Sequence, residues 1–341
     1  MAATWSPCDN AGVARDPIRI GLIGAARIAP KAVIAPALRS ADAEVVAVAA
    51  RSLERAQAFA AEHKVPRALG GYEQLIVDPA IDLVYVALPA SLHAQWSMAA
   101  LRAGKAVLCE KPFASSAAEA QAMVACAEEM GRPLLEAFHY RFHAAFLEVE
   151  RLVASGALGE TMEASADFLL PLVDRIGDIR WEPALGGGAL GDLGCYAVHA
   201  LRTLLGDEPE VVQADVRSLR GVDAATCARL DFDGIPAAIS CAMDSPSPKA
   251  TLRIEGELGW AMLENYVQPQ LGHRLVTTRE FAVTERIVEG PDSYTAQLAH
   301  VVAVLRGETE PMTGGADAIA NMVALDAIRA VAGLSPAETM A

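Results

Sequence analysis

The chain has 341 residues, of which 53% are hydrophobic and 21% are charged, and its formal net charge at pH 7 is -15. A chain of this length can bury a sizeable core, and the length favours two domains over one. The acidic balance argues against nucleic acid or an anionic membrane as a partner, because either polyanion would repel this surface. No apolar run reaches the roughly 18 residues that a membrane-spanning helix needs.

The first 17 residues lack the apolar core of a signal peptide. We therefore expect a flexible tail over 1–17 on a cytoplasmic protein. The six cysteines lie far apart and do not have the spacing of a zinc site, so we expect reduced thiols and no metal.

From Ile18 to about Phe142, short β-branched runs alternate with Ala-rich amphipathic stretches. The runs are IRIGLI, VVAVAA, DLVYVAL, AVLCE and PLLEAF. This alternation predicts an α/β domain over 18–142, with a parallel sheet covered on both faces. Ser116 and Glu119 predict the capped start of a helix that Gly131 ends.

After Phe142 the sequence pattern changes to longer strand-like runs, which turn residues connect. The runs include TMEASADFLL, PEVVQADVRSL, ATCARLDFD, PAAISCAM, ATLRIEGELG and WAMLENY. These runs predict a second, α+β domain over 143–341 with an open, mainly antiparallel sheet. Two helices, about 292–306 and 316–332, close the chain, and the last could pack back on the first domain. We expect one apolar face of the sheet to stay uncovered, and hence a homodimer or homotetramer.

The segment GLIGAARIA ends the first strand and begins the first helix, which is where a dinucleotide fingerprint belongs. Gly24 suits the tight turn, and Ala26 stands where a second glycine usually lets the backbone approach a pyrophosphate. We expect the pyrophosphate at the helix N-terminus, against Gly24, Ala25, Ala26, Arg27 and Ile28.

The second strand ends in Arg51 and Ser52, where an NAD enzyme usually carries an acidic residue for the ribose hydroxyls. Asp42 and Glu44 precede the strand, at its other end. No carboxylate therefore opposes a 2′-phosphate, and Arg51 can bind one, so NADP is favoured over NAD. An Arg51 that lies solvated on a loop is the alternative.

Two further segments carry candidate chemistry. Glu110 and Lys111 follow the strand AVLCE at the edge where open α/β sheets bind ligands, so Lys111 can reach the cleft. The segment GGGALGDLGCYAVH places Asp192, Tyr196 and His199 on one face of a predicted helix. An ion pair on a surface loop and an ordinary polar helix face are the alternatives.

Oxidation of a secondary alcohol needs a hydride acceptor and a group that takes the hydroxyl proton. Tyr196 can take that proton if the Lys111 ammonium lowers the pKa of the phenol. Asp192 can orient either group. His199 either binds a substrate hydroxyl or is only a hydrogen-bonded polar residue.

These residues stand in segments that are typical of one family: GLIGAARIAP, VAARS, LPASLHAQ, AGKAVLCEKP, EAFHYRFH, GGGALGDLGCY and NMVALDAIRAV. Over 18–333 the chain resembles the glucose-fructose oxidoreductase, inositol dehydrogenase and rhizopine catabolism family, Gfo/Idh/MocA. It is most similar to the branch with dimeric dihydrodiol dehydrogenases, xylose dehydrogenases and glucose-fructose oxidoreductase itself.

The resemblance implies a Rossmann NADP-binding domain, followed by a domain that binds the substrate and forms the oligomer. It implies hydride transfer between the nicotinamide and a secondary alcohol or carbonyl carbon of a sugar, polyol or cyclic diol. It makes Lys111 and Tyr196 catalytic, with Asp192 in support, and gives Arg51 and Ser52 the selection of NADP. The expected nicotinamide-side contacts are Leu88, Pro89, His93, Glu110 and Lys111, and the expected substrate contacts are Lys111, Tyr140, Arg141, Arg180, Trp181, Asp192, Tyr196 and His199.

Two departures from the family pattern are Ala90, where relatives commonly carry Asn, and Ala144, where many carry Pro. Two other functions fit the same fold. A cofactor-sensing regulator would bind NADP without turnover, but it need not keep Lys111, Asp192 and Tyr196 together. An NAD-dependent glycoside hydrolase would keep its cofactor bound, whereas an arginine at the ribose end favours exchangeable NADP.

Overall fold

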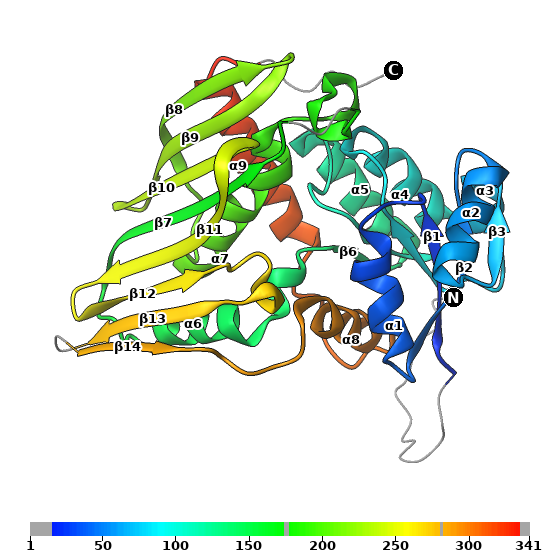
Figure 1. Ribbon diagram of the computed structural model, residues 1–341, viewed down its shortest axis with the longest axis horizontal. Coiled ribbons are helices and arrows are strands. Elements are labelled where there is room, and N and C mark those ends of the chain that lie inside the picture. The colour runs from blue at the N-terminus through cyan, green and yellow to red at the C-terminus, as the bar shows by residue number, and fades with distance from the viewer. Residues whose placement is uncertain (1–15, 174–176, 280–281, 335–341) are drawn as a thin grey trace.

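The protein has two β-sheets with helices between and around them (Figure 1). The computed structural model describes residues 16–173, 177–279 and 282–334. Most of the tail expected at 1–17 therefore lies outside the described residues. The α/β architecture predicted from the alternation of strands and helices is confirmed.

The first sheet has six parallel strands in the order β3-β2-β1-β4-β5-β6. Its strands are β1 (Ile18–Ile23), β2 (Ala43–Ala49), β3 (Arg67–Leu69), β4 (Leu83–Val86), β5 (Ala106–Cys109) and β6 (Leu134–Glu136). The runs of β4, β5 and β6 are buried throughout, as expected for strands with both faces covered. Because the strand order reverses between β1 and β4, the carboxyl ends of these strands open onto a crevice that suits a nucleotide.

The helices of this half begin and end where local chemistry dictates. They are α1 (Ala35–Leu38), α2 (Leu53–His63), α3 (Tyr72–Ile76), α4 (His93–Arg102) and α5 (Ala117–Met130). The Ser116 hydroxyl accepts a hydrogen bond from the Glu119 N–H at the start of α5, and Gly131, with φ of +58°, ends the helix. The capped helix predicted here is confirmed.

The second sheet has eight strands in the order β14-β13-β12-β11-β7-β10-β9-β8. Neighbours are antiparallel except β7 and β10, so the predicted mainly antiparallel sheet is confirmed. The strands are β7 (Thr161–Pro171), β8 (Glu210–Leu219), β9 (Val222–Phe232), β10 (Ile235–Ala242), β11 (Asp244–Gly256), β12 (Gly259–Glu264), β13 (Arg274–Arg279) and β14 (Ala282–Arg286).

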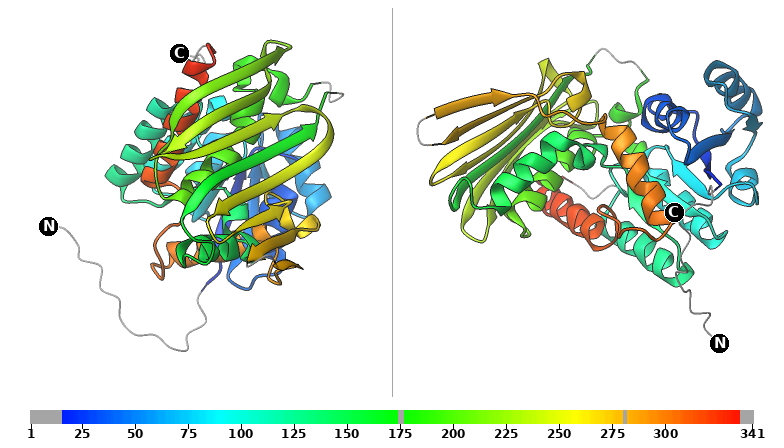
Figure 2. Two further views of the ribbon diagram at one scale, coloured as in Figure 1. Left: turned by 90° about the vertical axis from the view of Figure 1, so that its left-hand side faces the viewer. Right: turned by 90° about the horizontal axis from the view of Figure 1, so that it is seen from below.

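In the described part of the chain, helices cover one face of this sheet, and Figure 2 shows the other face without a covering helix. The expectation that the uncovered face is apolar is wrong. Lys249 pairs there with Asp167 at 2.6 Å, and Arg253 pairs with Glu255 at 2.6 Å and stacks on Trp260. In β7 and β10 buried residues alternate with less buried ones, so Ala166, Phe168 and Ile239 point inward while Ser165, Asp167 and Ser240 point outward.

The covering helices include α6 (Ala144–Ala154), α7 (Cys195–Leu205) and α9 (Gly315–Val331), while α8 (Ser293–Leu305) lies on the first half of the molecule. The side chains of α8 and α9 also bond to that half. Arg39 pairs with Asp292 at the start of α8, and Asp326 of α9 accepts from the Ala117 N–H at 2.8 Å. The two halves are thus joined by helices that follow the second sheet in sequence.

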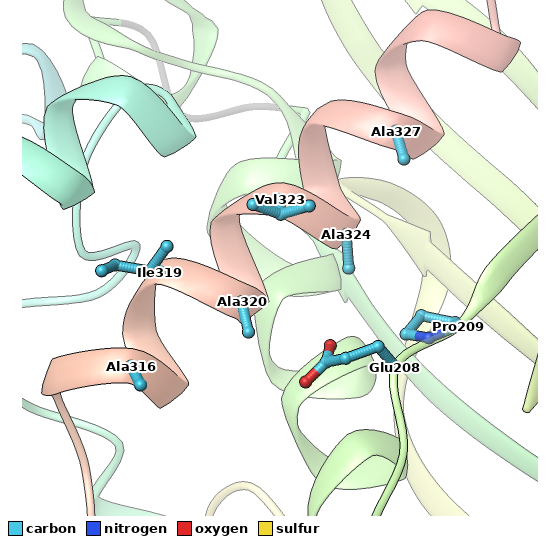
Figure 3. A pocket seen from close by; sticks show the side chains of 8 residues that line it. All are labelled: Glu208, Pro209, Ala316, Ile319, Ala320, Val323, Ala324 and Ala327. Atoms are coloured by element: carbon cyan, nitrogen blue, oxygen red, sulfur yellow. The ribbon is translucent and has the colours of Figure 1, made fainter.

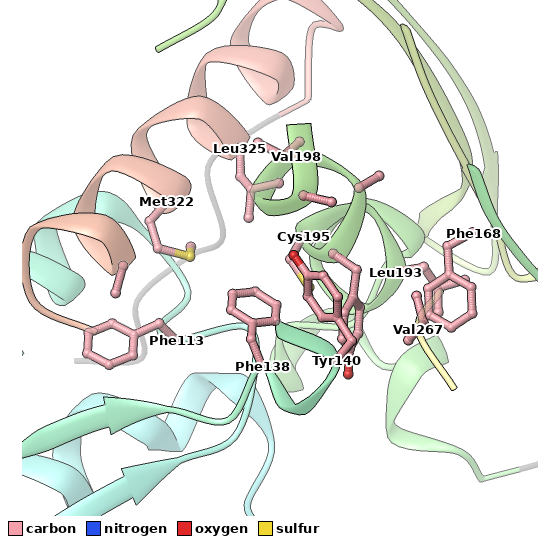
Figure 4. Close-up of a cluster of buried hydrophobic side chains, with 14 of the residues drawn as sticks. Phe113, Phe138, Tyr140, Phe168, Leu193, Cys195, Val198, Val267, Met322 and Leu325 are labelled. Atoms are coloured by element: carbon pink, nitrogen blue, oxygen red, sulfur yellow. The ribbon is translucent and has the colours of Figure 1, made fainter. Parts of the chain in front are cut away.

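A continuous apolar core connects the two sheets across this junction (Figure 4). It includes Phe113 and Phe138 from the first half, Phe168 from β7 and Met322 from α9, each 4% exposed or less. This core fixes the ends of β4, β5 and β6 against α7. No helix in the described part of the chain is both long and apolar enough to cross a membrane.

Candidate active site

The turn after β1 contains a position that requires glycine. Gly24 has φ of +100°, and a Cβ there would lie 2.4 Å from the carbonyl oxygen of Ala87. The chain then runs through residues 25–28 into a π-helical segment (Pro30–Ile34) that continues as α1. Because the first N–H groups of a helix have no partner in the helix, this turn can bind an anion.

The ribose end of the crevice carries two arginines. Arg51 is exposed directly after β2, as the sequence predicts. Ser52 caps α2 by accepting from the Arg55 N–H at 3.3 Å, so its hydroxyl is already used in the structure. The Arg55 guanidinium reaches back to the Ala25 carbonyl at 3.3 Å, and sequence reasoning missed it. Its position in the first turn of α2, four residues after Arg51, was the available signal.

The loops after β4 and β5 are held together by a histidine. His93 Nδ1 lies 2.8 Å from the Pro112 carbonyl oxygen and Nε2 lies 2.9 Å from the Leu88 carbonyl oxygen. The ring is 1% exposed, and its burial lowers the pKa of His93. The predicted cofactor contact is therefore a buried brace that fixes the loops containing Leu88, Pro89 and Lys111.

Glu110 also supports this edge. Its Oε1 accepts from the Tyr85 hydroxyl at 2.5 Å, and its Oε2 lies 3.3 Å from the Lys111 N–H. Burial raises the pKa of Glu110. The side chain is thus fixed between β4 and the lysine that follows it.

Lys111 and Asp192 meet across the junction of the two halves, as the sequence predicts. Lys111 Nζ lies 2.6 Å from Asp192 Oδ1 and 2.8 Å from the Asp192 carbonyl oxygen. Burial alone lowers the pKa of Lys111, but the carboxylate outweighs burial and raises it. Lys111 Nζ also lies 5.1 Å from the centroid of the Tyr196 ring. The three side chains predicted to converge therefore do converge.

The expectation that Lys111 lowers the pKa of the Tyr196 phenol is wrong for this structure. Burial raises the pKa of the Tyr196 phenol well above its ordinary value, and Glu110 raises it further. The Lys111 ammonium lies over the ring and binds Asp192, so it does not offset burial at the phenol oxygen. Tyr196 consequently keeps its proton at neutral pH.

A cavity of about 50 Å³ opens at this point. It is lined by Leu88, Pro89, Ala90, Lys111, Pro112, Ile179, Arg180, Leu185, Gly186, Gly187 and Asp192. Arg180 Nε lies 2.6 Å from Asp192 Oδ2. Burial opposes ionisation of Asp192, but Arg180 and Lys111 outweigh burial and lower the pKa of its carboxyl strongly. The cavity thus contains one carboxylate held between two cations.

Five predicted substrate contacts, Tyr140, Arg141, Trp181, Tyr196 and His199, do not line this cavity. The Tyr140 hydroxyl bonds to His199 Nδ1 at 2.5 Å, and His199 Nε2 lies 3.0 Å from Asp317. Arg141 forms a bidentate pair with Glu150 at 2.6 and 2.8 Å. Trp181 is buried and donates to a backbone carbonyl. These side chains pack and brace the fold around the cavity, and Figure 4 shows Tyr140 among the core residues.

The three glycines before Asp192 allow close packing beside the cavity. A Cβ on Gly186 would lie 3.1 Å from the Ala90 Cβ, and one on Gly187 would lie 2.5 Å from the Arg180 carbonyl oxygen. Gly188 has φ of +132°, and a Cβ there would lie only 2.0 Å from Asp223 Oδ1. The strap formed by residues 177–188 therefore lies tightly against the loop after β4.

A second hollow lies on α9 (Figure 3) and is wider, at about 290 Å³. It is lined by Glu208, Pro209, Ala316, Ile319, Ala320, Val323, Ala324 and Ala327. The Glu208 carboxylate pairs with Arg202 at 2.6 Å. This alanine-rich groove offers no converging polar groups for chemistry. Among the described residues, no three His, Cys, Asp or Glu side chains are grouped so that they could hold a metal ion.

Comparison with known proteins gives the family. Residues 18–138 match the oxidoreductase family with an NAD-binding Rossmann fold, and residues 146–262 match the GFO/IDH/MocA C-terminal domain. The chain is similar to a D-xylose 1-dehydrogenase (NADP(+)) from Haloferax volcanii, with 37% identity over 90% of this chain and 95% of that protein. It is 38% identical to a trans-1,2-dihydrobenzene-1,2-diol dehydrogenase from Danio rerio, over 70% of this chain and 72% of the other.

The fold is also found in solved structures. A 3-ketoreductase from Actinomadura kijaniata, in complex with NADP and TDP-benzene, superposes with a TM-score of 0.85 at 29% identity, covering 92% of this chain and 97% of that one. The two matches cover the whole first sheet and, in the second sheet, β7 to β11 and most of β12. The chain therefore belongs to the GFO/IDH/MocA family of oxidoreductases.

Proposed function

We propose that this protein transfers a hydride between NADP and a secondary alcohol or carbonyl carbon of a sugar, polyol or cyclic diol. The observation that carries the proposal is the Lys111 ammonium, held by Asp192 at the carboxyl end of β5 and lining the cavity. Relatives named for NADP-dependent xylose oxidation and for dihydrodiol oxidation support the cofactor and the substrate class. Residues 18–142 would bind NADP, and residues 143–341 would bind the substrate and a second copy.

The residues at the crevice fit a dinucleotide. The turn from Gly24 to Ile28 would receive the pyrophosphate, because Gly24 allows a conformation that a side chain would block. Arg51 and Arg55 would hold the 2′-phosphate, since guanidinium groups bind phosphate oxygens in a bidentate manner. The nicotinamide would lie against the loop of Leu88 and Pro89.

The cofactor, when bound, supplies or accepts the hydride at the reacting carbon. Lys111 donates a hydrogen bond to the substrate oxygen and stabilises the negative charge that develops there. Asp192 aims the ammonium. In reduction Tyr196 gives its proton to that oxygen, and in oxidation it takes the proton back. Burial raises the pKa of Tyr196 and Asp192 raises that of Lys111, so both side chains would enter reduction as hydrogen-bond donors.

We also propose a homodimer or homotetramer in the cytoplasm. The uncovered face of the eight-stranded sheet supports the assembly, although its polar surface predicts an interface with many ion pairs and hydrogen bonds. The free thiols of all five described cysteines are typical of a reducing compartment.

A substrate panel tests the proposed function. Purified protein is mixed with NADPH and keto sugars, or with NADP and aldoses, inositols or trans-dihydrodiols, while absorbance of NADPH is followed. We expect at least one sugar or cyclic diol to be turned over, with NADP preferred to NAD. Tight NADPH binding without turnover across the panel would instead favour a cofactor-sensing regulator, and release of a free sugar from glycosides would favour a hydrolase.

A further inference from the structure

Alternating charges run from the dinucleotide turn to the lysine of the cavity. Arg27 lies 3.0 Å from Asp178, whose other oxygen lies 3.1 Å from Arg180 Nη1. Arg180 lies 2.6 Å from Asp192, and Asp192 lies 2.6 Å from Lys111. Every step of this chain is within ion-pair distance, and it crosses from one half of the molecule to the other.

Asp178 is the central member, and it is buried. Its side chain is 1% exposed, while that of Arg27 is 77% exposed. Burial disfavours the charged form of Asp178, but Arg180 outweighs burial, and the net effect lowers the pKa of Asp178. A buried carboxylate is costly to maintain unless its partners compensate its charge, and here two guanidinium groups from different loops do so.

Asp178 also begins the strap that closes one side of the cavity. It caps the short 3-10 helix Ile179–Trp181 by accepting from the Arg180 N–H at 3.2 Å. Further along the strap, Gly186 packs against Ala90 in the loop after β4. The strap is thus attached to the cofactor-binding half at two places: through the Arg27 ion pair and through Gly186.

We propose that Asp178 is a positioning residue for the reaction proposed above, on which this inference rests. Through Arg180 it keeps Asp192 aimed at Lys111, and through Arg27 it ties the strap to the turn that would receive the pyrophosphate. Cofactor binding and the arrangement of the reacting groups are thereby coupled.

The contacts of Asp178 with Arg180 and with Arg27 predict two separable effects. Without the charge of Asp178, Arg180 is drawn toward Asp192 and competes with Lys111 for its carboxylate, so turnover falls. Without the pair between Arg27 and Asp178, the strap is released from the dinucleotide turn, so NADPH dissociates more easily. A residue with only a structural role would lower the melting temperature and leave both quantities unchanged in the folded protein.

The experiment uses Asp178→Asn, because asparagine still caps a helix but carries no charge. NADPH affinity is measured by fluorescence titration, and kcat and KM are measured on the best substrate of the panel. Asp292→Asn is the matched control, since Asp292 caps α8 and pairs with Arg39 outside the cavity. Circular dichroism reports folding, and Asp178→Ser, which also caps without charge, replaces the asparagine variant if that variant is unfolded.

We expect Asp178→Asn to lower kcat by about 10-fold to 100-fold, as small misplacements of reacting groups do. It should weaken NADPH binding by about threefold to tenfold, because the pair of exposed Arg27 with buried Asp178 should contribute more than a surface ion pair and less than a buried one. In an Arg27→Met background, the same change should still lower kcat but should no longer weaken NADPH binding.

Unchanged kcat in folded Asp178→Asn would overturn the proposal, as would an equal loss of NADPH affinity with and without Arg27. If the unaltered protein turns over no substrate, the proposed function fails, and the NADPH titrations alone decide the coupling. If the losses of NADPH affinity caused by the Arg27 and Asp178 substitutions are not additive in the double variant, the coupling is supported. Additive losses would overturn it.

Discussion

At the scale of single residues, the site is organised by where its protons stay. Asp192 remains a carboxylate between Arg180 and Lys111, and Lys111 remains an ammonium because of that carboxylate. Tyr196 remains a neutral phenol because it is buried. In the proposed reaction, Lys111 and Tyr196 would each donate a hydrogen bond to the substrate carbonyl oxygen.

This arrangement predicts different pH dependences for the reduction and oxidation directions. Since burial raises the pKa of Tyr196, reduction with NADPH should stay constant through the neutral range. Oxidation needs a proton acceptor, so its rate should rise with pH and show no plateau below about pH 10. Initial rates in both directions between pH 6 and about pH 10 check this. An oxidation plateau near neutral pH would show that another group takes the proton.

Tyr196→Phe removes the proposed proton donor while keeping the ring beside Lys111. We expect kcat to fall by about 10²-fold to 10⁴-fold, with NADPH affinity unchanged. Tyr266→Phe is a suitable control, because Tyr266 is another fully buried tyrosine of the same core. Near-normal turnover in Tyr196→Phe would leave Lys111 as the sole acid-base group.

The two arginines at the ribose end predict cofactor selectivity. Arg51→Ala should weaken NADP binding by about 10-fold to 150-fold and leave NAD binding nearly unchanged, because only NADP carries the 2′-phosphate. Arg55→Ala should act in the same direction. Titration of each variant with both cofactors is the measurement, and an equal loss for NADP and NAD would contradict the assignment.

At the scale of elements, the segment before α7 explains why one prediction about the helix face failed. The sequence pattern placed Asp192, Tyr196 and His199 on one helix face. A π-helical segment (Leu190–Gly194) precedes α7, and its wider turn changes the angular relation between Asp192 and the residues that follow. His199 is then engaged by Tyr140 and Asp317, contacts between distant segments that no local spacing reveals.

Other elements could be predicted because their signals are local. The strand runs of the first sheet, the Ser116 cap and the Gly24 turn follow from periodicity, capping and backbone sterics. Strands β13 and β14 were not predicted, and β14 is exposed throughout, so it lacks an alternating apolar pattern. Asp178 and Arg55 lie in loops or helix starts, where composition alone does not indicate partners across a cleft.

The glycines of the strap predict a stability difference. Gly188→Ala puts a methyl group 2.0 Å from Asp223 Oδ1 at a φ of +132°, so the strap must shift. We expect a loss of about 2 to 4 kcal/mol in the free energy of unfolding, from strain and from the displaced buried carboxylate. Gly206→Ala is the control, because Gly206 has φ of +73° and open space around it. Equal losses in chemical denaturation would contradict the close packing of the strap.

At the scale of the whole molecule, the fold brings two halves together so that each supplies part of one site. Lys111 follows β5, Asp192 lies in the segment before α7, and Arg180 lies in the strap. The large acidic charge disfavours a polyanionic partner such as nucleic acid. NADP is itself anionic, and the arginines at the crevice offset the repulsion locally.

In the proposed reaction, this site moves a hydride between NADP and a substrate carbon while Lys111 binds the substrate oxygen. The most direct measurement uses NADPH labelled with deuterium at C4 of the nicotinamide and mass spectrometry of the product alcohol. We expect deuterium on the former carbonyl carbon with the unaltered protein, and a loss of about 10²-fold or more in that rate in Lys111→Met with NADPH still bound. Two results would contradict this hydride transfer. One is a product that lacks deuterium whichever face of the nicotinamide carries the label, and the other is an unchanged rate in Lys111→Met.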